Sequence, residues 1–418
     1  MPDSQREFDL VLYGATGFVG RLTAQYLARA GGQARIGLAG RNGERLRAVR
    51  EELGAAARSW AILHADASAP TTLTEMAERA QVVVSTVGPY TRYGLPLVAA
   101  CAEAGTDYAD LTGEAMFVRN SIDGYHKQAV DTGARIVHAC GFDSIPSDLS
   151  VYALHRQVVA DDTGQMLDTD FVLRRFRGGL SGGTIASGME MMRTASSDPE
   201  ARRAVADPYT FSADRAAEPR LGAQPDFPWR RGAEIAPELA GIWTGGFLMA
   251  PYNTRVVRRS NELLGWAYGR RFRYSEQMSV GSSMLASATA ALVTVGNKAA
   301  VELGSRYFRL LPRRWVERLA PQPGTGPSET QRDRGFYQAQ TFTITSTGAR
   351  YRAGIAQQGD PGYKATAVLL GESGLALALD RDRLSPLTGV LTPAAAMGDA
   401  LLDRFPAAEV VLEVTRLG

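Results

Sequence analysis

Three glycines near the start of the chain have the spacing of a phosphate-binding turn. Gly14, Gly17 and Gly20 lie in VLYGATGFVG, between an apolar run and a helical pattern. In a dinucleotide-binding turn, the first glycine permits the tight turn, the second lets backbone approach the pyrophosphate, and the third lets helix and strand pack closely. The new helix then offers free N–H groups and its positive dipole end to the phosphates. We therefore predict a dinucleotide site that includes Thr16 and Phe18; the alternative is a turn needed only for packing.

Residues after the next three predicted strands add detail to this site. The second strand ends at Arg41, and no acid stands beside it before Glu44. A cation there favours the 2′-phosphate of NADP, whereas an acid would bind the ribose hydroxyl of NAD; the alternative is a solvated arginine at a helix start. Asp66 ends the third strand, where it meets the adenine amino group or caps the next helix. Thr86 and Gly88 end the fourth strand, and we place Gly88 under the nicotinamide ribose.

The first 150 residues must position these side chains, and they alternate between strand and helix patterns. Segments rich in Val, Ile and Leu, from FDLVLYG to ARIVHACG, are separated by amphipathic stretches. This repetition predicts an α/β fold with a Rossmann-type, doubly wound parallel sheet covered by helices on both faces. The strand, the glycine turn and the helix then stand in the order that a dinucleotide site requires.

Beyond residue 150 the pattern changes, which indicates a second domain. Amphipathic strands such as LDTDFVLRRF and YQAQTFTITSTG are separated by loops rich in Pro, Gly and Arg. They predict an α+β domain that carries a mixed or antiparallel sheet. We therefore divide the chain into an NADP-binding domain at 1–150 and a substrate domain at 151–391. A last helix, at about 392–404, is expected to return to the first domain.

Composition narrows the classes of function. The 418 residues are 45% hydrophobic and 22% charged, as in ordinary globular proteins, and a net charge of +2 gives no case for nucleic-acid binding. Cys101 and Cys140 have no spacing for a metal or a disulfide and are expected to be buried and inert. The HExxH, paired-cysteine and P-loop motifs are missing, so we predict no metal. The polar segment before the first strand does not read as a signal peptide, and a cytoplasmic location is expected.

Longer motifs carry a family resemblance. GATGFVG, AGRN, TVGPYTRYGLPLVAACAEAGTDYADLTGE, ACGFDSIPSDL, SGGTIAS and LTPAAAMGDALL resemble the saccharopine dehydrogenase family. Within it, the chain is most similar to the trans-acting enoyl reductases of phthiocerol and phenolphthiocerol dimycocerosate lipid synthesis. The resemblance implies NADPH-dependent reduction of a carbon–carbon double bond in a polyketide-derived acyl chain, carried by a polyketide synthase. It also implies that GLSGGTIAS, at 179–187, is a glycine-rich turn bordering the substrate site.

Such a reduction needs a donor that binds the carbonyl oxygen, and a proton source. Tyr90 directly follows Gly88 and Pro89, so its phenol is expected to face the nicotinamide and donate; the alternative is packing on the sheet edge. Asp143 follows the sixth strand, where it holds a donor or a ribose hydroxyl, or caps the next helix. The other polar side chains expected at this end of the sheet are Tyr93, Tyr108, Asp110, Glu114 and Ser144.

Two other functions stay open. The same fold could reduce an imine, as saccharopine-forming reductases do, because the second domain has arginines enough for a doubly charged substrate. A protein of a different class would bind NADP only as a structural ligand and associate with lipid or membrane.

One uncharged segment suggests contact with long apolar molecules. Residues 277–297 carry no charge and lie between arginine-rich stretches at 270–273 and 306–314. Ser, Thr, Gly and Asn are too frequent there for a membrane span. We expect a buried or tunnel-lining helix that turns an apolar wall toward an acyl chain, formed by Met284, Leu285, Leu292 and Val293. The alternative is a peripheral helix at the inner face of the plasma membrane, with its arginine flanks against anionic head groups or an acidic carrier protein.

Overall fold

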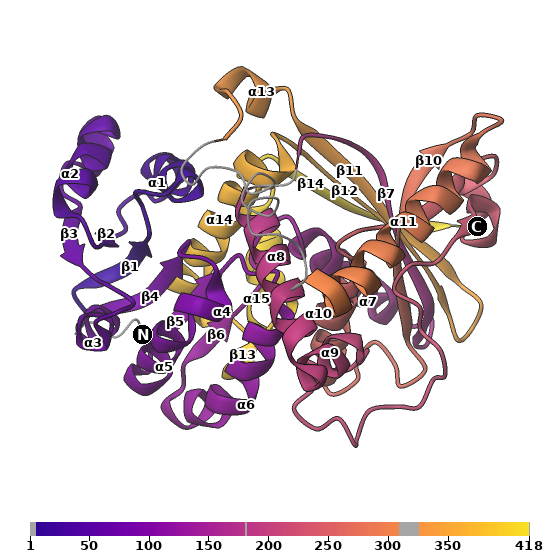
Figure 1. Cartoon of the computed structure of the whole chain (residues 1–418), viewed down its shortest axis with the longest axis horizontal. Coiled ribbons are helices and arrows are strands. Elements are labelled where there is room, and N and C mark those ends of the chain that lie inside the picture. Colours follow the sequence, from indigo (N-terminus) through magenta and orange to yellow (C-terminus); the bar gives the residue numbers. More distant parts are fainter. Residues whose placement is uncertain (1–5, 180–181, 309–325, 418) are drawn as a thin grey trace.

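Two sheets and their helices make up the part of the chain that the structure describes (Figure 1). This computed structural model describes residues 6–179, 182–308 and 326–417, and within them each sheet has seven strands. Both sheets have helices packed against them. Cys101 and Cys140 are buried, and burial raises the pKa of both thiols, as expected of inert cysteines.

The first sheet is parallel throughout, with the order β13-β6-β5-β4-β1-β2-β3. Its strands are β1 (Phe8–Tyr13), β2 (Ile36–Gly40), β3 (Ala61–His64), β4 (Ala80–Ser85), β5 (Asp107–Asp110), β6 (Arg135–Val137) and β13 (Gly389–Leu391). Alternate residues of β1 enter different cores, with Leu10 and Leu12 on one face and Val11 on the other. The predicted Rossmann-type, doubly wound sheet is therefore confirmed.

Helices cover both faces of this sheet. They are α1 (Phe18–Ala30), α2 (Gly43–Glu52), α3 (Pro70–Arg79), α4 (Tyr90–Tyr93), α5 (Leu95–Ala104), α6 (Ala115–Thr132), α7 (Ile145–Ala160), α14 (Thr366–Leu379) and α15 (Pro393–Arg404). The strand β13 and the helix α14, which packs on β1, β4 and β5, belong to this first sheet and its cover, whereas the sequence pattern predicts residues 151–391 to form the second domain. The return to the first domain thus begins earlier than 392, near Thr366.

The second sheet is mixed, with the order β14-β12-β11-β7-β10-β9-β8. Only β7 and β10 pair in parallel; the other neighbours are antiparallel. Its strands are β7 (Met166–Arg177), β8 (Arg230–Arg231), β9 (Trp243–Gly246), β10 (Arg273–Gly281), β11 (Phe336–Thr345), β12 (Arg350–Gln358) and β14 (Val410–Leu417). Its accompanying helices are α8 (Gly182–Ser197), α9 (Pro199–Ala206), α10 (Ala250–Leu263), α11 (Ala286–Tyr307) and α13 (Glu329–Asp333). The predicted α+β character with a mixed sheet is confirmed.

Two predictions about local structure are wrong. The stretch expected as a glycine-rich turn at 179–187 becomes helical from Gly182 and opens α8, while Leu180 and Ser181 lie outside the described residues. The uncharged segment is not one helix, because β10 takes its first residues and α11 begins only at Ala286.

The helix α11 does not line a tunnel with the side chains expected to do so. Met284, Leu285 and Leu292 are 103%, 72% and 73% exposed, and Val293 is half-buried. The helix packs on α8 and β9 through small residues such as Ala286 and Ala290. The arginines at 309–314 lie outside the described residues. Across the described ranges, no helix is both long and apolar enough to cross a membrane.

Candidate functional site

In the glycine turn between β1 and α1, different glycines serve close packing and ligand access. A Cβ added to Gly20 would lie 2.2 Å from the Gly14 carbonyl oxygen, and one added to Gly14, whose φ is +94°, would lie 2.7 Å from Thr86 Oγ1. Gly17, by contrast, is exposed at the N-cap of α1, and its nearest such contact is 3.4 Å away. The packing of α1 on β1 therefore needs Gly20, whereas Gly17 leaves open backbone at a helix N-terminus, which fits a pyrophosphate.

Residues from the second half of the chain close over this turn. The ring of Phe18 packs edge-on against Tyr363, with centroids 5.0 Å apart, and the Arg332 guanidinium lies 5.3 Å from its centroid. The Tyr363 hydroxyl accepts a hydrogen bond from the Gly182 N–H at 2.9 Å, which ties the start of α8 to the same place. No sequence motif marked Arg332 or Tyr363, because their approach depends on the fold of distant segments. Thr16, beside Phe18, is half-buried.

Arg41 and Asp66 lie close together at the ends of β2 and β3. Among the described residues, the exposed Arg41 side chain has no hydrogen bond or ion pair, so its guanidinium is available to a 2′-phosphate. Asp66 does not cap α3, whose N-cap is Ala69; its carboxylate accepts a hydrogen bond from the Ser68 N–H at 2.9 Å instead. This bond and the nearby Arg41 hold the pKa of Asp66 below its usual value.

The end of β4 is fastened to the glycine turn. Thr86 Oγ1 donates to the carbonyl oxygens of Gly14 and Tyr13, at 3.2 and 3.3 Å. Gly88 follows as exposed backbone, and the nearest atoms to a Cβ placed on it would be in the ring of Tyr90, at 3.6 Å. Gly17 and Gly88 thus present open backbone at the carboxyl edge of the parallel strands, where ligands of such sheets bind.

Tyr90 does not face this edge, contrary to the sequence prediction. Its side chain is 3% exposed, its ring stacks on Phe117, and its hydroxyl donates to the Ser85 carbonyl oxygen at 3.0 Å. Burial also raises the pKa of the phenol. Tyr90 is the first residue of α4, and side chains of a helix lean toward its N-terminus, so the ring points back toward β4. Its packing role explains the residue without a contact to substrate.

Glu114 joins three segments around the same edge. Its buried carboxylate accepts hydrogen bonds from the backbone N–H groups of Tyr90 and Thr91, both at 2.8 Å, and from Ser187 Oγ at 2.6 Å. The first two donors belong to the start of α4, where a negative charge is favourable. Ser187 belongs to α8, so this carboxylate fixes α8 against the Rossmann domain.

Hydrogen bonds to the Asp110 carboxylate join the side chains of Tyr108 and His138 inside the domain. The Tyr108 hydroxyl donates to Asp110 Oδ2 at 2.9 Å, and His138 Nδ1 lies 2.8 Å from the same oxygen. The three side chains are buried, so this set supports β5 and β6 rather than meeting a ligand. Tyr93 is 37% exposed and contacts the Arg92 guanidinium.

Asp143 lies at this edge with a carboxyl group that has no hydrogen-bond partner among the described residues. Helix α7 has Ser144 as its N-cap, so Asp143 does not cap it, and among the described residues the carboxylate makes no hydrogen bond. Burial raises its pKa to about 6. A Cβ added to Gly113 would lie 4.0 Å from Asp143 Oδ2 and 3.6 Å from Met249 Cε. The carboxyl group therefore lies next to Gly113 in the β5–α6 loop, as does Met249, and its protonated form predominates below about pH 6.

Within the described ranges, no cluster of His, Cys, Asp and Glu side chains is arranged to hold a metal ion. The polar groups at the carboxyl edge instead suit a phosphate-bearing coenzyme and a proton transfer.

Comparisons with known proteins bear directly on this site. The profile of the Saccharopine dehydrogenase NADP binding domain matches residues 10–137, which contain the glycine turn, Arg41 and Asp66. A Mycobacterium tuberculosis protein with the name "Putative trans-acting enoyl reductase Rv2449c" is 69% identical over 417 residues, covering 100% of both chains. Trans-acting enoyl reductases of Mycobacterium bovis and Mycobacterium ulcerans are 66% and 63% identical over 418 residues, again covering 100% of both chains.

A solved structure shows the same overall fold. Saccharopine dehydrogenase (L-Glu forming) of Saccharomyces cerevisiae matches 98% of this chain and 99% of its own, with a TM-score of 0.54 and 14% identity. The resemblance seen in the sequence motifs is thereby confirmed. The chain belongs to the trans-acting enoyl reductases of the saccharopine dehydrogenase family, and it is an NADP-dependent oxidoreductase.

Proposed function

We propose that the protein is an NADPH-dependent enoyl reductase that acts in trans on a polyketide-derived acyl chain, in complex lipid synthesis of the phthiocerol type. The names of relatives that are 63% to 69% identical over the full length support the reaction class. The observation that carries it in the structure is Asp143, a carboxyl group without a hydrogen-bond partner among the described residues, at the same sheet edge as Gly17 and Gly88.

Different residues of the chain bind the coenzyme and transfer the proton. Gly17 and the N-terminus of α1 would hold the pyrophosphate, and Arg41 the 2′-phosphate. When bound there, NADPH would supply the hydride for the β-carbon of the enoyl group. Asp143 in its protonated form donates to the α-carbon, and the raised pKa keeps that form populated in mildly acidic to neutral solution. Met249 and this carboxyl group both lie next to Gly113.

Steady-state assays with three kinds of substrate test this function. The protein should oxidise NADPH with an enoyl thioester and release the saturated thioester. Oxidation only with an α-keto acid and an amino acid together would assign imine reduction instead. Tight NADPH binding without turnover of either substrate would show a non-catalytic role.

Arg41 should set the coenzyme preference. NADPH is expected to bind more tightly than NADH by about 1–3 kcal/mol, or roughly 5- to 150-fold, because a guanidinium–phosphate contact is charge-assisted. Arg41→Ala should remove most of this gap, as measured by fluorescence titration with both coenzymes. Arg58→Ala, which removes another exposed arginine of the same domain, is the matched control. Equal affinity of the unmodified protein for NADPH and NADH would contradict the assignment.

We further propose that α11 supports contact with an anionic membrane, since its outward face exposes Leu285, Leu292, Val295 and Leu303. Lys298 stands on the same helix, and Tyr307, which is 53% exposed, ends it. Apolar residues with basic and aromatic neighbours are typical of interfacial helices.

Vesicle flotation tests this contact. The protein should float with vesicles that contain anionic lipid, and Leu292→Asp should reduce the bound fraction at least several-fold because a carboxylate enters the interface poorly. Leu379→Asp, at a leucine that is 45% exposed on α14, should leave flotation unchanged. Identical flotation of the two variants would exclude α11 as the contact.

A further inference from the structure

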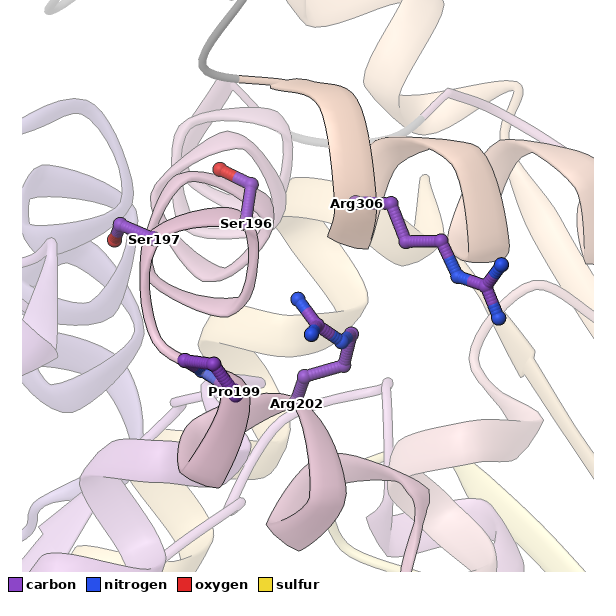
Figure 2. Close-up of a pocket in the computed structure, with 5 residues that line it drawn as sticks. All are labelled: Ser196, Ser197, Pro199, Arg202 and Arg306. Atoms are coloured by element: carbon purple, nitrogen blue, oxygen red, sulfur yellow. The ribbon is translucent and has the colours of Figure 1, made fainter.

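A cavity of about 460 Å³ lies where α8 ends, α9 begins and α11 ends. Figure 2 shows the five residues that line it: Ser196, Ser197, Pro199, Arg202 and Arg306. The guanidinium of Arg202 points into the space between the helices, and Arg306 extends from α11 at the rim. Arg202 and Arg306, which belong to separate helices, thus both line this cavity.

No acid among the described residues forms an ion pair with either of these arginines. Among the described residues, Arg306 has no hydrogen bond or ion pair, and Arg202 uses one N–H group on the Ala195 carbonyl oxygen at 3.0 Å. The remaining guanidinium donors of both side chains are free to bind an anion, and arginine suits the oxygens of a phosphate.

The acids closest in sequence are engaged elsewhere or point to solvent. Glu302, one turn before Arg306, pairs with Lys298 at 3.8 Å. The Asp198 carboxylate caps α9 by accepting from the Glu200 N–H at 2.8 Å, and the Glu200 side chain is exposed. The cavity is thus set up for a ligand with negative charge.

Helix α8 connects this cavity to the candidate active site. Its first residue contacts Tyr363 near the glycine turn, Ser187 is bound by Glu114 next to α4, and Ser196 and Ser197 reach the cavity. Nine residues separate Ser187 from Ser196, which corresponds to about 14 Å along a helix axis. The cavity and the candidate active site are therefore joined by a single helix and lie about 14 Å apart along it.

We propose that Arg202 and Arg306 bind the phosphate of a phosphopantetheine arm that carries the acyl substrate. From phosphorus to sulfur, such an arm has roughly the backbone length of four to five residues and spans about 15 Å when extended. This length matches the distance along α8, so a phosphate in the cavity leaves the thioester beside Glu114 and α4. The inference rests on the proposed function, because it assumes a substrate delivered by a carrier.

Kinetics with matched thioesters test the assignment. The same enoyl chain is offered on 4′-phosphopantetheine and on pantetheine, which lacks the phosphate. The unmodified protein should show a KM at least tenfold lower for the phosphorylated substrate. The variant with Arg202→Ala and Arg306→Ala together should lose this advantage, with kcat and the KM for the pantetheine thioester unchanged. Arg203→Ala, next to Arg202 but outside the cavity, should behave as the unmodified protein.

Binding measurements without turnover test the phosphate site independently of the proposed reaction. Calorimetric titration should show tighter binding of 4′-phosphopantetheine than of pantetheine, and the difference should vanish in the double variant, whether or not any thioester is reduced. Equal binding of the two ligands, or equal losses for both in the double variant, would overturn the inference. So would a double variant that binds 4′-phosphopantetheine normally but no longer floats with anionic vesicles, since the cavity would then hold a lipid head group. Turnover of neither thioester, with intact phosphate-dependent binding, would overturn the proposed reaction alone.

Discussion

Gly17→Val is expected to weaken NADPH binding by about 100-fold or more while the fold stays intact. The valine side chain would stand where backbone N–H groups must reach the pyrophosphate, and each lost hydrogen bond to a charged group costs about 1.5–3 kcal/mol. The backbone tolerates the change, because φ at Gly17 is −75° and an added Cβ would approach only the Gly14 carbonyl oxygen, at 3.4 Å.

Gly20→Val provides the contrast that makes this result interpretable. A Cβ there would lie 2.2 Å from the Gly14 carbonyl oxygen, so α1 must move away from β1. Such overpacking typically costs about 1–3 kcal/mol, and the midpoint of thermal unfolding should fall. Circular dichroism melts and NADPH titrations on both variants separate the two roles. A Gly17→Val protein that is folded and binds NADPH normally would show that this glycine serves packing alone.

The first sheet could be predicted because burial on both faces leaves a clear pattern. Strands such as β1 and β4 are apolar at nearly every position, and the helices between them expose one polar face. The helix α14 gave no comparable signal, since it is buried on all sides and its apolar residues have no helical period. The three-residue strand β13 is also too short to stand out, so the return of residues 366–404 to the first domain was underestimated.

Site residues were predictable where the backbone itself is the functional group. The glycine turn follows from local chain geometry, which a sequence motif states directly. Side-chain direction does not follow in this way. The orientation of Tyr90 depends on where α4 begins and on the buried Glu114 carboxylate that holds its start. Arg332 and Tyr363 come to the glycine turn only through the fold of the second half of the chain.

The helix α11 shows the same limit at the surface. Its uncharged sequence suggested burial, but the helix meets α8 and β9 through Ala286, Ala290 and Thr294 and turns its larger side chains outward. Hydrophobicity alone could not distinguish a face packed by small residues from one packed by large ones. Which face is buried was decided by the close approach of β9, where a Cβ on Gly245 would lie 3.0 Å from the Ala290 carbonyl oxygen.

Asp143→Asn is expected to lower kcat by about 100- to 1,000-fold and to leave NADPH affinity nearly unchanged, since a positioned proton donor contributes on this scale. The pKa of Asp143 is raised to about 6 by burial, so the protonated donor is lost as the pH rises through that value. In the unmodified protein, kcat should therefore fall above about pH 6. In Asp143→Asn, the residual kcat should no longer fall above about pH 6; this fall is called the pH limb of kcat.

A second readout follows from the sign of the pKa shift. The folded protein binds the Asp143 proton more tightly than the unfolded chain, so Asp143 makes the free energy of unfolding decrease as the pH rises from about 4 to about 6, above which its effect levels off. Asp143→Asn removes this decrease, and the variant should melt at a higher temperature than the unmodified protein at pH 8.

Asp148→Asn is the matched control for the role of Asp143 in proton transfer. Burial raises the pKa of Asp148 as well, to about 7, but its carboxylate is held by Ser260 and by the Ala394 N–H. Its replacement should lower stability, because those donors lose a charged acceptor, and should keep the pH limb of kcat. If Asp143→Asn retained full activity and the same limb, the proton would have to come from Tyr93 or from water.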